Sequence, residues 1–311
     1  VVAKASELSP MTAFLFSKAC IEAGFPKGVL NIVHGSWQKV GLPLARHDGI
    51  RALAFVGDSA TGAALATQLA GSFKKLSLTL SGKNPNLIFE DCQFDQMMVG
   101  TLRSSFSNNG QISFSGSRIF VQRPLYTQFR DQLVKRTQFL KVGDPFSAVT
   151  DLGALISREH KERVLSYLAL AEVEGGAILC GGQPLELQGE LANGYFLRPA
   201  VIEGLPVDCR TNQEEIFGPV VTITPFDTEE EAVAMANRSS YGLSASIWTQ
   251  DIRRANRVAE QIRAGMVWIN CWMVPDLRPS IEPAKQSGLN RDGGIEALHF
   301  FSDNKTICVK Y

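Results

Sequence analysis

The feature that most constrains the fold is a regular alternation of strand and helix signals over the first third of the chain. Short apolar, β-branched runs are separated by segments whose apolar residues recur at helical spacing. Strands that are spaced by helices form parallel sheets, because a parallel pair needs a crossover connection. The expected strands cover residues 29–33, 50–55 and 75–80, and the expected helices cover residues 10–23, 40–44 and 61–69. The pattern predicts the α/β architecture of a dinucleotide-binding domain.

After Lys83 the elements become longer, without a repeat, a low-complexity tract or a linker-like run. The expected strands are residues 86–89, 117–122, 177–180, 220–225, 245–249, 266–270 and 306–310. The expected helices are residues 95–107, 125–140, 157–173, 229–237 and 252–262. The change of rhythm near Lys83 indicates a second α/β region rather than a flexible hinge.

Composition is ordinary for a soluble globular protein: 45% of the 311 residues are hydrophobic and 20% are charged. Lys and Arg total 31 and Asp and Glu total 31, so no net charge recruits nucleic acid or an acidic membrane. No apolar run approaches the roughly 20 residues of a membrane span, and the opening residues 1–4 do not resemble a signal peptide. Because the chain opens on two valines without a Met, we expect it to begin inside a fold.

The six cysteines and four histidines are scattered along the chain, with no Cys-x-x-Cys pair and no Cys/His cluster. Scattered cysteines in a chain of this size are typical of buried free thiols in a reducing compartment. We therefore expect a cytoplasmic protein without disulfides and without a metal site.

Two segments carry the most specific signal. Residues 109–118 read Asn-Gly-Gln-Ile-Ser-Phe-Ser-Gly-Ser-Arg, and residues 78–85 read Leu-Thr-Leu-Ser-Gly-Lys-Asn-Pro. The first resembles the Gly-Gln-x-Cys loop of the aldehyde dehydrogenases, with Ser113 at the position of the catalytic cysteine. The second resembles that family's Glu-Leu-Gly-Gly-Lys motif, with Thr79 at the position of the catalytic glutamate.

Further matches to the aldehyde dehydrogenases occur in order along the whole chain. They lie at residues 2–7, 23–31, 214–219, 236–243 and 265–270, and residues 214–219 match the family word Glu-Glu-Ile-Phe-Gly-Pro outright. Within the family, residues 103–106, 153–157 and 270–272 are most similar to one group of semialdehyde dehydrogenases. The resemblance covers only the family's C-terminal part, somewhat over half of a normal chain.

The resemblance implies a site whose chemistry has changed. In the family a cysteine thiolate attacks the aldehyde, hydride passes to NAD, and a glutamate activates the water that releases the acid. A free thiol has a pKa of about 8.5, whereas a serine hydroxyl is far less acidic and depends on an adjacent base. Thr79 cannot carry away a proton at neutral pH, and loss of a positioned base typically costs ~10² to 10⁴ in rate. Ser113 and Thr79 are therefore both degenerate catalytic positions in this interpretation.

The cofactor positions implied by the resemblance are mixed. Lys4 and Glu7 match family residues that hold the adenosine ribose of NAD, and Glu215 and Phe217 match those at the nicotinamide ribose and ring. Gly57 and Asp58 lie in the turn that leads into the helix facing the pyrophosphate, where the family has serine instead of Asp58. A carboxylate is a good helix N-cap, but it occupies the place that a phosphate would take. Asp58 is thus expected to be a helix cap, and NAD binding to be weak or absent.

The resemblance also implies how the chain is organised. Residues 1–82 would form a partial Rossmann-type NAD-binding domain, residues 83–303 an aldehyde dehydrogenase-type α/β catalytic domain, and residues 304–311 an oligomerisation strand. That strand resembles the family's exchanged strand, so a homo-oligomer is expected; an ordinary edge strand is the alternative.

Three functional hypotheses remain open at this stage. The first is a catalytically inactive family member that acts as a scaffold or interaction partner. The second is an active NAD-dependent semialdehyde dehydrogenase that uses Ser113 in an atypical site. The third is a truncated, pseudogene-like product without a selected function. Aldehyde-dependent NADH production that is lost on S113A would separate the second hypothesis from the first.

Overall fold

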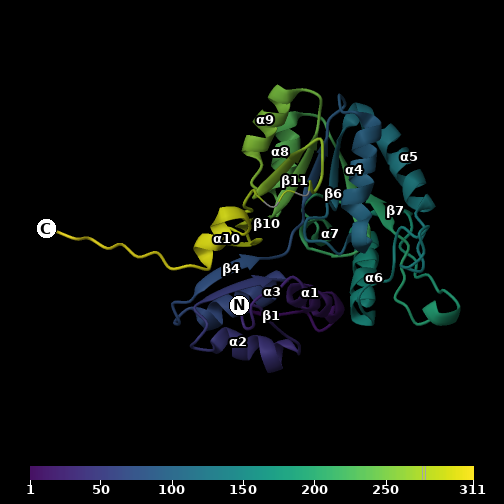
Figure 1. Ribbon diagram of the computed structural model, residues 1–311. Helices are drawn as coiled ribbons and strands as arrows, with labels where there is room; N and C mark the ends of the chain where they lie inside the picture. The colour runs from purple at the N-terminus through teal and green to yellow at the C-terminus, as the bar shows by residue number, and fades with distance from the viewer. Residues whose placement is uncertain (275, 277) are drawn as a thin grey trace. The chain divides into compact units, whose positions relative to one another are not determined.

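The computed structural model describes residues 1–274, 276 and 278–311. The chain divides into two compact units, and each is described by itself (Figure 1). The first unit comprises Val1–Ala54 and Ala63–Leu76, and the second comprises Phe55–Gly62 and Ser77–Tyr311. The functional boundary expected at residue 82 stays a prediction.

The first unit has the predicted alternation of strands and helices. Its elements are β1 (Val2–Lys4), α1 (Pro10–Glu22), β2 (Asn31–Val33), a π-helical turn (Trp37–Gly41) and α2 (Leu42–Arg46). β1 and β2 are parallel, with Val2 opposite Asn31 and Lys4 opposite Val33. Helix α1 begins at Pro10, as expected, since proline lacks the N–H that the first turn leaves unpaired. The Ser9 side chain, however, makes no capping hydrogen bond.

Three elements are divided between the two units: β3 (Ala52–Val56), α3 (Ser59–Leu69) and β4 (Lys75–Thr79). Within the second unit the end of β4 pairs with β14 (Gly288–Leu289), so that Thr79 lies opposite Gly288. The backbone N–H of Gly57, just after β3, donates to the Thr79 carbonyl at 3.2 Å. The turn that leads into α3 is thereby anchored to the end of β4.

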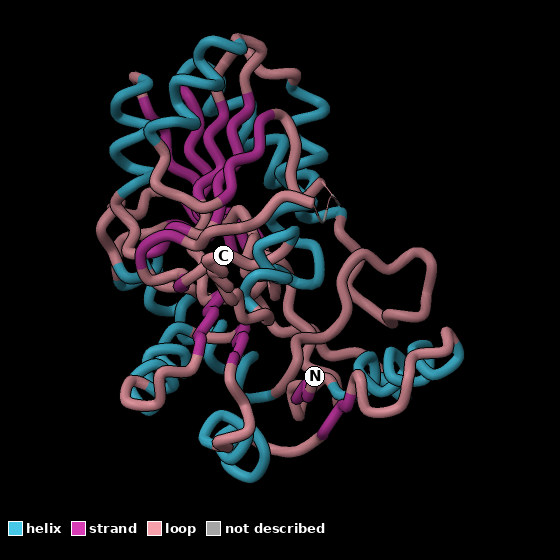
Figure 2. Tube along the Cα trace, turned by 60° about the vertical axis from the view of Figure 1, so that its left-hand side comes forward, coloured by secondary structure: helices cyan, strands magenta, loops and turns pink. Residues whose placement is uncertain are grey.

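The second unit is built on a seven-stranded sheet in the order β12-β11-β5-β6-β9-β8-β7. Its strands are β5 (Pro85–Ile88), β6 (Arg118–Gln122), β7 (Ala177–Cys180), β8 (Ala200–Glu203), β9 (Val220–Phe226), β11 (Ser244–Trp248) and β12 (Met266–Ile269). The pairs are parallel except for β7 with β8. Figure 2 shows these strands side by side with helices around them.

Helices cover both faces of this sheet. The helices are α4 (Phe94–Phe106), α5 (Arg123–Phe139), α6 (Arg158–Val173), α7 (Arg210–Gln213), α8 (Glu229–Asn237) and α9 (Ile252–Gln261). One buried cluster joins α4 and α5 to the sheet through residues such as Met98, Phe129 and Ile119. A second joins α8 and α9 to the other face through Leu87, Phe120 and Val258. Alternate residues of each strand face opposite helical layers, which is why the sheet is buried on both faces. The predicted mixed α/β fold is confirmed.

The remaining short elements were not expected from the sequence. They are two 3₁₀ turns (Ser107–Gly110 and Gly189–Leu191), β10 (Tyr241–Gly242), β13 (Ala284–Lys285) and α10 (Gly294–Phe300). β8, α7 and β14 were also not anticipated.

The strand expected at residues 306–310 is not formed in the single chain. Residues 303–311 have no helix or strand and are exposed, and Figure 1 shows them leading away from α10. A strand needs the hydrogen bonds of a neighbouring strand, and none is paired with this segment here. The role of residues 304–311 as an oligomerisation strand requires a second chain, so it stays a prediction.

Candidate active site

The loop that carries Ser113 connects α4 to β6 and has an unusual backbone. Asn108, Asn109 and Gly110 have φ angles of +51°, +58° and +67°, all in the left-handed region. A Cβ at Gly110 would lie 2.2 Å from the Gly218 carbonyl oxygen, so only glycine fits there. The Asn109 amide donates to the Ala154 carbonyl at 3.2 Å. The loop conformation is therefore fixed by contacts on both sides.

The two segments with the strongest sequence signal lie against each other. The Asn84 amide donates to the carbonyls of Ser113 at 2.7 Å and Ser115 at 2.9 Å. Its oxygen accepts the Ser244 N–H at 3.1 Å. A Cβ at Gly82 would lie 2.4 Å from the Ser113 carbonyl oxygen, so the backbones are in close contact. Ser113 is half-buried, and its hydroxyl hydrogen-bonds no acidic or basic side chain in the described part of the chain.

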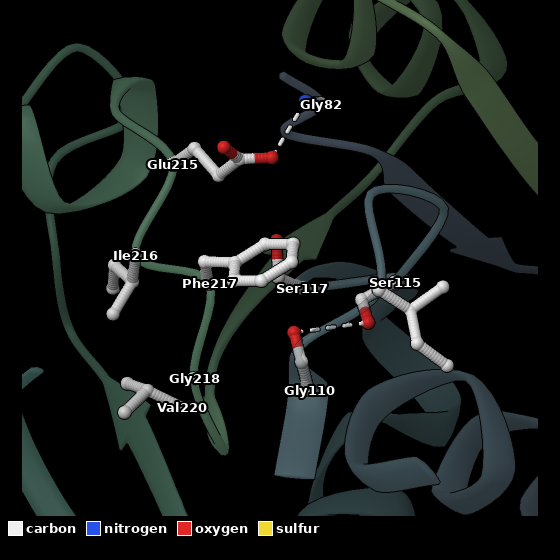
Figure 3. Close-up of a pocket in the computed structure, with 10 residues that line it drawn as sticks. Gly82, Gly110, Ser115, Ser117, Glu215, Ile216, Phe217, Gly218 and Val220 are labelled. Atoms are coloured by element: carbon white, nitrogen blue, oxygen red, sulfur yellow. Dashed lines mark hydrogen bonds between the residues drawn. The ribbon is translucent and has the colours of Figure 1, made fainter. Parts of the chain in front are cut away.

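Glu215 and Phe217 form the facing wall of a small pocket beside this loop (Figure 3). The pocket is lined by Gly82, Gly110, Ile112, Ser115, Ser117, Glu215, Ile216, Phe217, Gly218 and Val220. In Figure 3 the Glu215 carboxylate points to Gly82, whose N–H donates to it at 2.8 Å. Burial raises the pKa of Glu215 above its ordinary value, against hydrogen bonds from Ser81 and Gly82 that lower it. Glu215 is the one ionisable side chain among these lining residues.

Helix α6 holds the Glu215–Phe217 segment in place. Arg163 donates to the Glu215 carbonyl at 2.8 Å, and the His160 ring nitrogen Nε2 lies 2.6 Å from the Phe217 carbonyl oxygen. Burial lowers the pKa of His160, so a neutral imidazole that donates from Nε2 accounts for this contact at neutral pH. Phe217 itself has a φ of +59°, a conformation that its neighbours must support.

Two buried cations lie under this region, and sequence reasoning did not identify their burial. Lys83 is 2% exposed, and burial together with the nearby Arg118 lowers its pKa to about 7, although Glu215 opposes the shift. Arg118 is 1% exposed, and burial lowers its pKa to about 9. Its guanidinium donates to the carbonyls of Lys83, Met235 and Ala236 at 2.9, 3.3 and 2.9 Å. These acceptors come from distant parts of the sequence, so no local pattern reveals them.

Asp58 caps helix α3, as the sequence suggested. Its carboxylate accepts the Thr61 N–H at 2.9 Å and the Thr61 hydroxyl at 2.7 Å. Burial acts to raise the pKa of Asp58, but the Thr61 hydrogen bonds outweigh it and leave the pKa below its ordinary value. A negative charge therefore already uses the N–H groups that an anionic phosphate would need.

Lys4 and Glu7, in the first unit, bind each other. The Lys4 ammonium lies 2.7 Å from the Glu7 carboxylate, and this hydrogen bond lowers the pKa of Glu7. Thr79 is half-buried in β4. The second unit contains most of the residues proposed as site positions: Gly57, Asp58, Thr79, Ser113, Glu215 and Phe217.

All six cysteines are free, but only Cys20 and Cys180 are buried, and Cys308 is exposed on the tail. Residues 1–274, 276 and 278–311 contain no group of three or more His, Cys, Asp and Glu side chains that could hold a metal ion. Over the same residues, no helix combines the length and apolarity needed to cross a bilayer.

The sequence model of the aldehyde dehydrogenase family matches residues 1–307. The chain belongs to the aldehyde dehydrogenase family, as its motifs predicted. Among curated relatives, 2-aminomuconic semialdehyde dehydrogenase of Danio rerio is 44% identical, and 2-hydroxymuconic semialdehyde dehydrogenase of Pseudomonas putida is 42% identical. Each alignment covers 100% of this chain and 64% of the relative. The chain thus spans 64% of their length, and the expected similarity to a group of semialdehyde dehydrogenases is confirmed.

Solved structures agree with this assignment. Betaine aldehyde dehydrogenase from Staphylococcus aureus, in complex with NAD+, superposes with a TM-score of 0.90 at 36% identity, covering 96% of this chain and 59% of that chain. A mutant form of aldehyde dehydrogenase from Bacillus cereus gives a TM-score of 0.92 at 37% identity, covering 96% of this chain and 60% of that chain. The fold surrounding the Ser113 loop is therefore that of the family.

Proposed function

We propose that this chain is a catalytically inactive aldehyde dehydrogenase-family protein that binds a ligand in the family's site and acts as a scaffold or interaction partner. The observation that carries the proposal is the isolated Ser113 hydroxyl. The family loop is intact around it, yet no acidic or basic side chain among the described residues hydrogen-bonds it. A hydroxyl without an adjacent base is a poor nucleophile at neutral pH. The hydroxyl of Thr79 cannot supply that base.

The same proposal includes weak or absent NAD binding. NAD accepts a hydride in the reaction of the family, and Glu215 and Phe217 would adjoin its nicotinamide ribose. The diphosphate, however, does not fit the chain as it stands, because the ionised Asp58 carboxylate already caps α3. Lys4 and Glu7, proposed for the adenosine ribose, already bind each other. Each arrangement, taken by itself, opposes binding of the corresponding part of NAD.

The ligand class follows from the relatives. Muconic semialdehydes, which the relatives' names give as substrates, have an aldehyde at one end and a carboxylate at the other. We infer that this chain recognises the same class of small carboxylate-bearing molecule.

An active dehydrogenase that uses Ser113 is the second candidate, and one observation favours it. Glu215 is a largely buried carboxylate in the pocket lining, and burial raises its pKa above the ordinary value. A group of this kind is a better general base than an ordinary carboxylate. If Glu215 reached the Ser113 hydroxyl when a ligand is bound, the hydroxyl could be activated.

We further propose that the protein is cytoplasmic and assembles with a second copy through residues 304–311. Six free cysteines are consistent with a reducing compartment. In the tail, Ile307 and Val309 are 76% and 67% exposed and occupy alternate positions. This pattern is typical of a strand that pairs with a strand of another chain. Sedimentation of the full chain and of a chain ending at residue 303 tests this assembly; equal masses would contradict it.

Calorimetry and an aldehyde assay together test the main proposal. The inactive protein should bind muconate, an unreactive analogue, and should release no NADH from a muconic semialdehyde at saturating NAD. NADH production that S113A abolishes would establish the active alternative instead. A folded chain that binds no muconate would contradict the ligand-binding part of the proposal.

A further inference from the structure

An arginine with no carboxylate partner among the described residues lies next to the Ser113 loop. Arg103 is in the last turn of α4 and is exposed. Its guanidinium carbon lies 5.9 Å from the centroid of the Trp272 ring, within the range of a cation–π contact. A role for Arg103 in ligand recognition rests on the proposed function, since it concerns the ligand of that same site.

Trp272 connects this arginine to the loop. Its indole N–H donates at 2.9 Å to the carbonyl of Phe114, the residue that follows Ser113. The Phe114 ring in turn meets the Trp268 ring edge to face, with 5.8 Å between the centroids. Trp272 is buried, whereas Phe114 and Trp268 are half-buried. Arg103 is therefore the exposed member of this cluster, and Phe114 and Trp268 each remain partly exposed beside the loop.

The position of Arg103 is set by the packing of α4. Gln96 lies seven residues earlier, on the same helical face, and its amide approaches the Asn270 carbonyl at 3.5 Å. The segment that follows β12 thus runs along this face of α4. It contacts the helix at Gln96 and again, through Trp272, at Arg103.

The guanidinium of Arg103 keeps its hydrogen-bonding capacity for a ligand. Within residues 1–274, 276 and 278–311, no carboxylate pairs with it, whereas Arg257 is bound by both oxygens of Glu229 at 2.6 and 2.8 Å. A guanidinium binds a carboxylate through two parallel hydrogen bonds, and the cation–π contact with Trp272 restrains the position of the Arg103 guanidinium. Such an arrangement recognises a carboxylate better than a flexible surface cation does.

We propose that Arg103 binds the carboxylate of a semialdehyde or of its acid whose other end lies at the Ser113 loop. The conjugated carbon chain would rest on the wall formed by Phe114 and Trp268. Arg103 then selects ligands with a second charged end over simple aldehydes. It acts in recognition and takes no part in bond making.

Titration with muconate tests this assignment, with calorimetry for the affinity and tryptophan fluorescence for the location. R103Q, which keeps hydrogen-bond donors but loses the charge, should weaken muconate binding about ten-fold, equivalent to roughly 1.4 kcal/mol. R103K, which keeps the charge but loses the planar fork, should bind with intermediate affinity. R253Q on α9 is the matched control, since Arg253 is also an exposed helical arginine. The uncharged diamide of muconate should bind the unsubstituted chain and R103Q equally weakly.

The outcomes separate this inference from the proposed function. If the unsubstituted chain binds muconate and R103Q binds it with the same affinity, the Arg103 assignment is wrong while ligand binding stands. An equal loss in R253Q would also overturn it, because the effect would then come from net charge. If the folded, unsubstituted chain binds no muconate, both the assignment and the proposed function fail.

Discussion

Neutralising Asp58 should strengthen NAD binding if, as we propose, its charge occupies the place of the cofactor's diphosphate at the start of helix α3. The carboxylate is held by two hydrogen bonds from Thr61, at 2.9 and 2.7 Å, and its lowered pKa keeps it ionised at neutral pH. Two unit charges about 4 Å apart repel by roughly 1 kcal/mol in water and about 4 kcal/mol at an effective dielectric constant of 20. Because Asp58 is partly exposed, screening favours the lower part of this range. We expect D58N to bind NAD about ten-fold more tightly, since roughly 1.4 kcal/mol is a factor of ten.

D58N is the informative substitution because asparagine caps a helix about as well as aspartate. The stability of the chain should therefore change little, and the gain in affinity should shrink as salt is added. Calorimetric titration of NAD into the unsubstituted chain, D58N and E260Q measures the effect. Glu260 is an exposed carboxylate on α9, so E260Q removes the same charge elsewhere. The reasoning is refuted if D58N gains no affinity or if E260Q gains as much.

Two further predictions concern the buried polar groups. Between pH 7 and 10.5 the unfolded chain holds a proton on Lys83 that the folded chain lacks, so the free energy of unfolding should rise with pH over this range. K83M should reduce this dependence on pH and stabilise the chain at pH 7. Urea unfolding at several pH values measures both effects, and an equal change of the free energy of unfolding with pH in the two proteins would contradict the prediction. Asn86 accepts the Trp248 indole N–H at 2.7 Å and donates to Thr101 at 3.0 Å. N86L should thus lower the free energy of unfolding by about 1–3 kcal/mol, and an unchanged urea midpoint would show that these bonds contribute nothing.

Local signals were sufficient for most elements of the fold. The helix at residues 61–69 and the strand at residues 75–80 appear as α3 and β4, with boundaries shifted by only one or two residues. Their apolar spacing and flanking turn residues are local properties. Strand β8 and helix α10 were missed, because neither has a distinct pattern. β8 is defined by its pairing with β7 and β9.

The site was predictable only as far as its motifs reach. The Gly-Gln-x-Ser loop and residues 214–219 identified the family, and the structure places both segments beside one pocket. The sequence could not predict the burial of Lys83 and Arg118, or that Arg103 lacks a carboxylate partner among the described residues. Both properties depend on long-range contacts. Arg118, for example, donates to carbonyls more than a hundred residues away. The strand-like pattern of residues 304–311 is not formed as a strand in the single chain, and its role in assembly stays a prediction.

The central claim, that the site binds without oxidising, is tested most directly by a single-turnover experiment. The protein, in excess, would be mixed with a muconic semialdehyde and saturating NAD, and NADH absorbance would be followed until it is constant. We expect no NADH above that of a protein-free control, because neither Ser113 nor Thr79 supplies an ionised nucleophile or a base. One equivalent of NADH per semialdehyde, absent in S113A, would contradict the account.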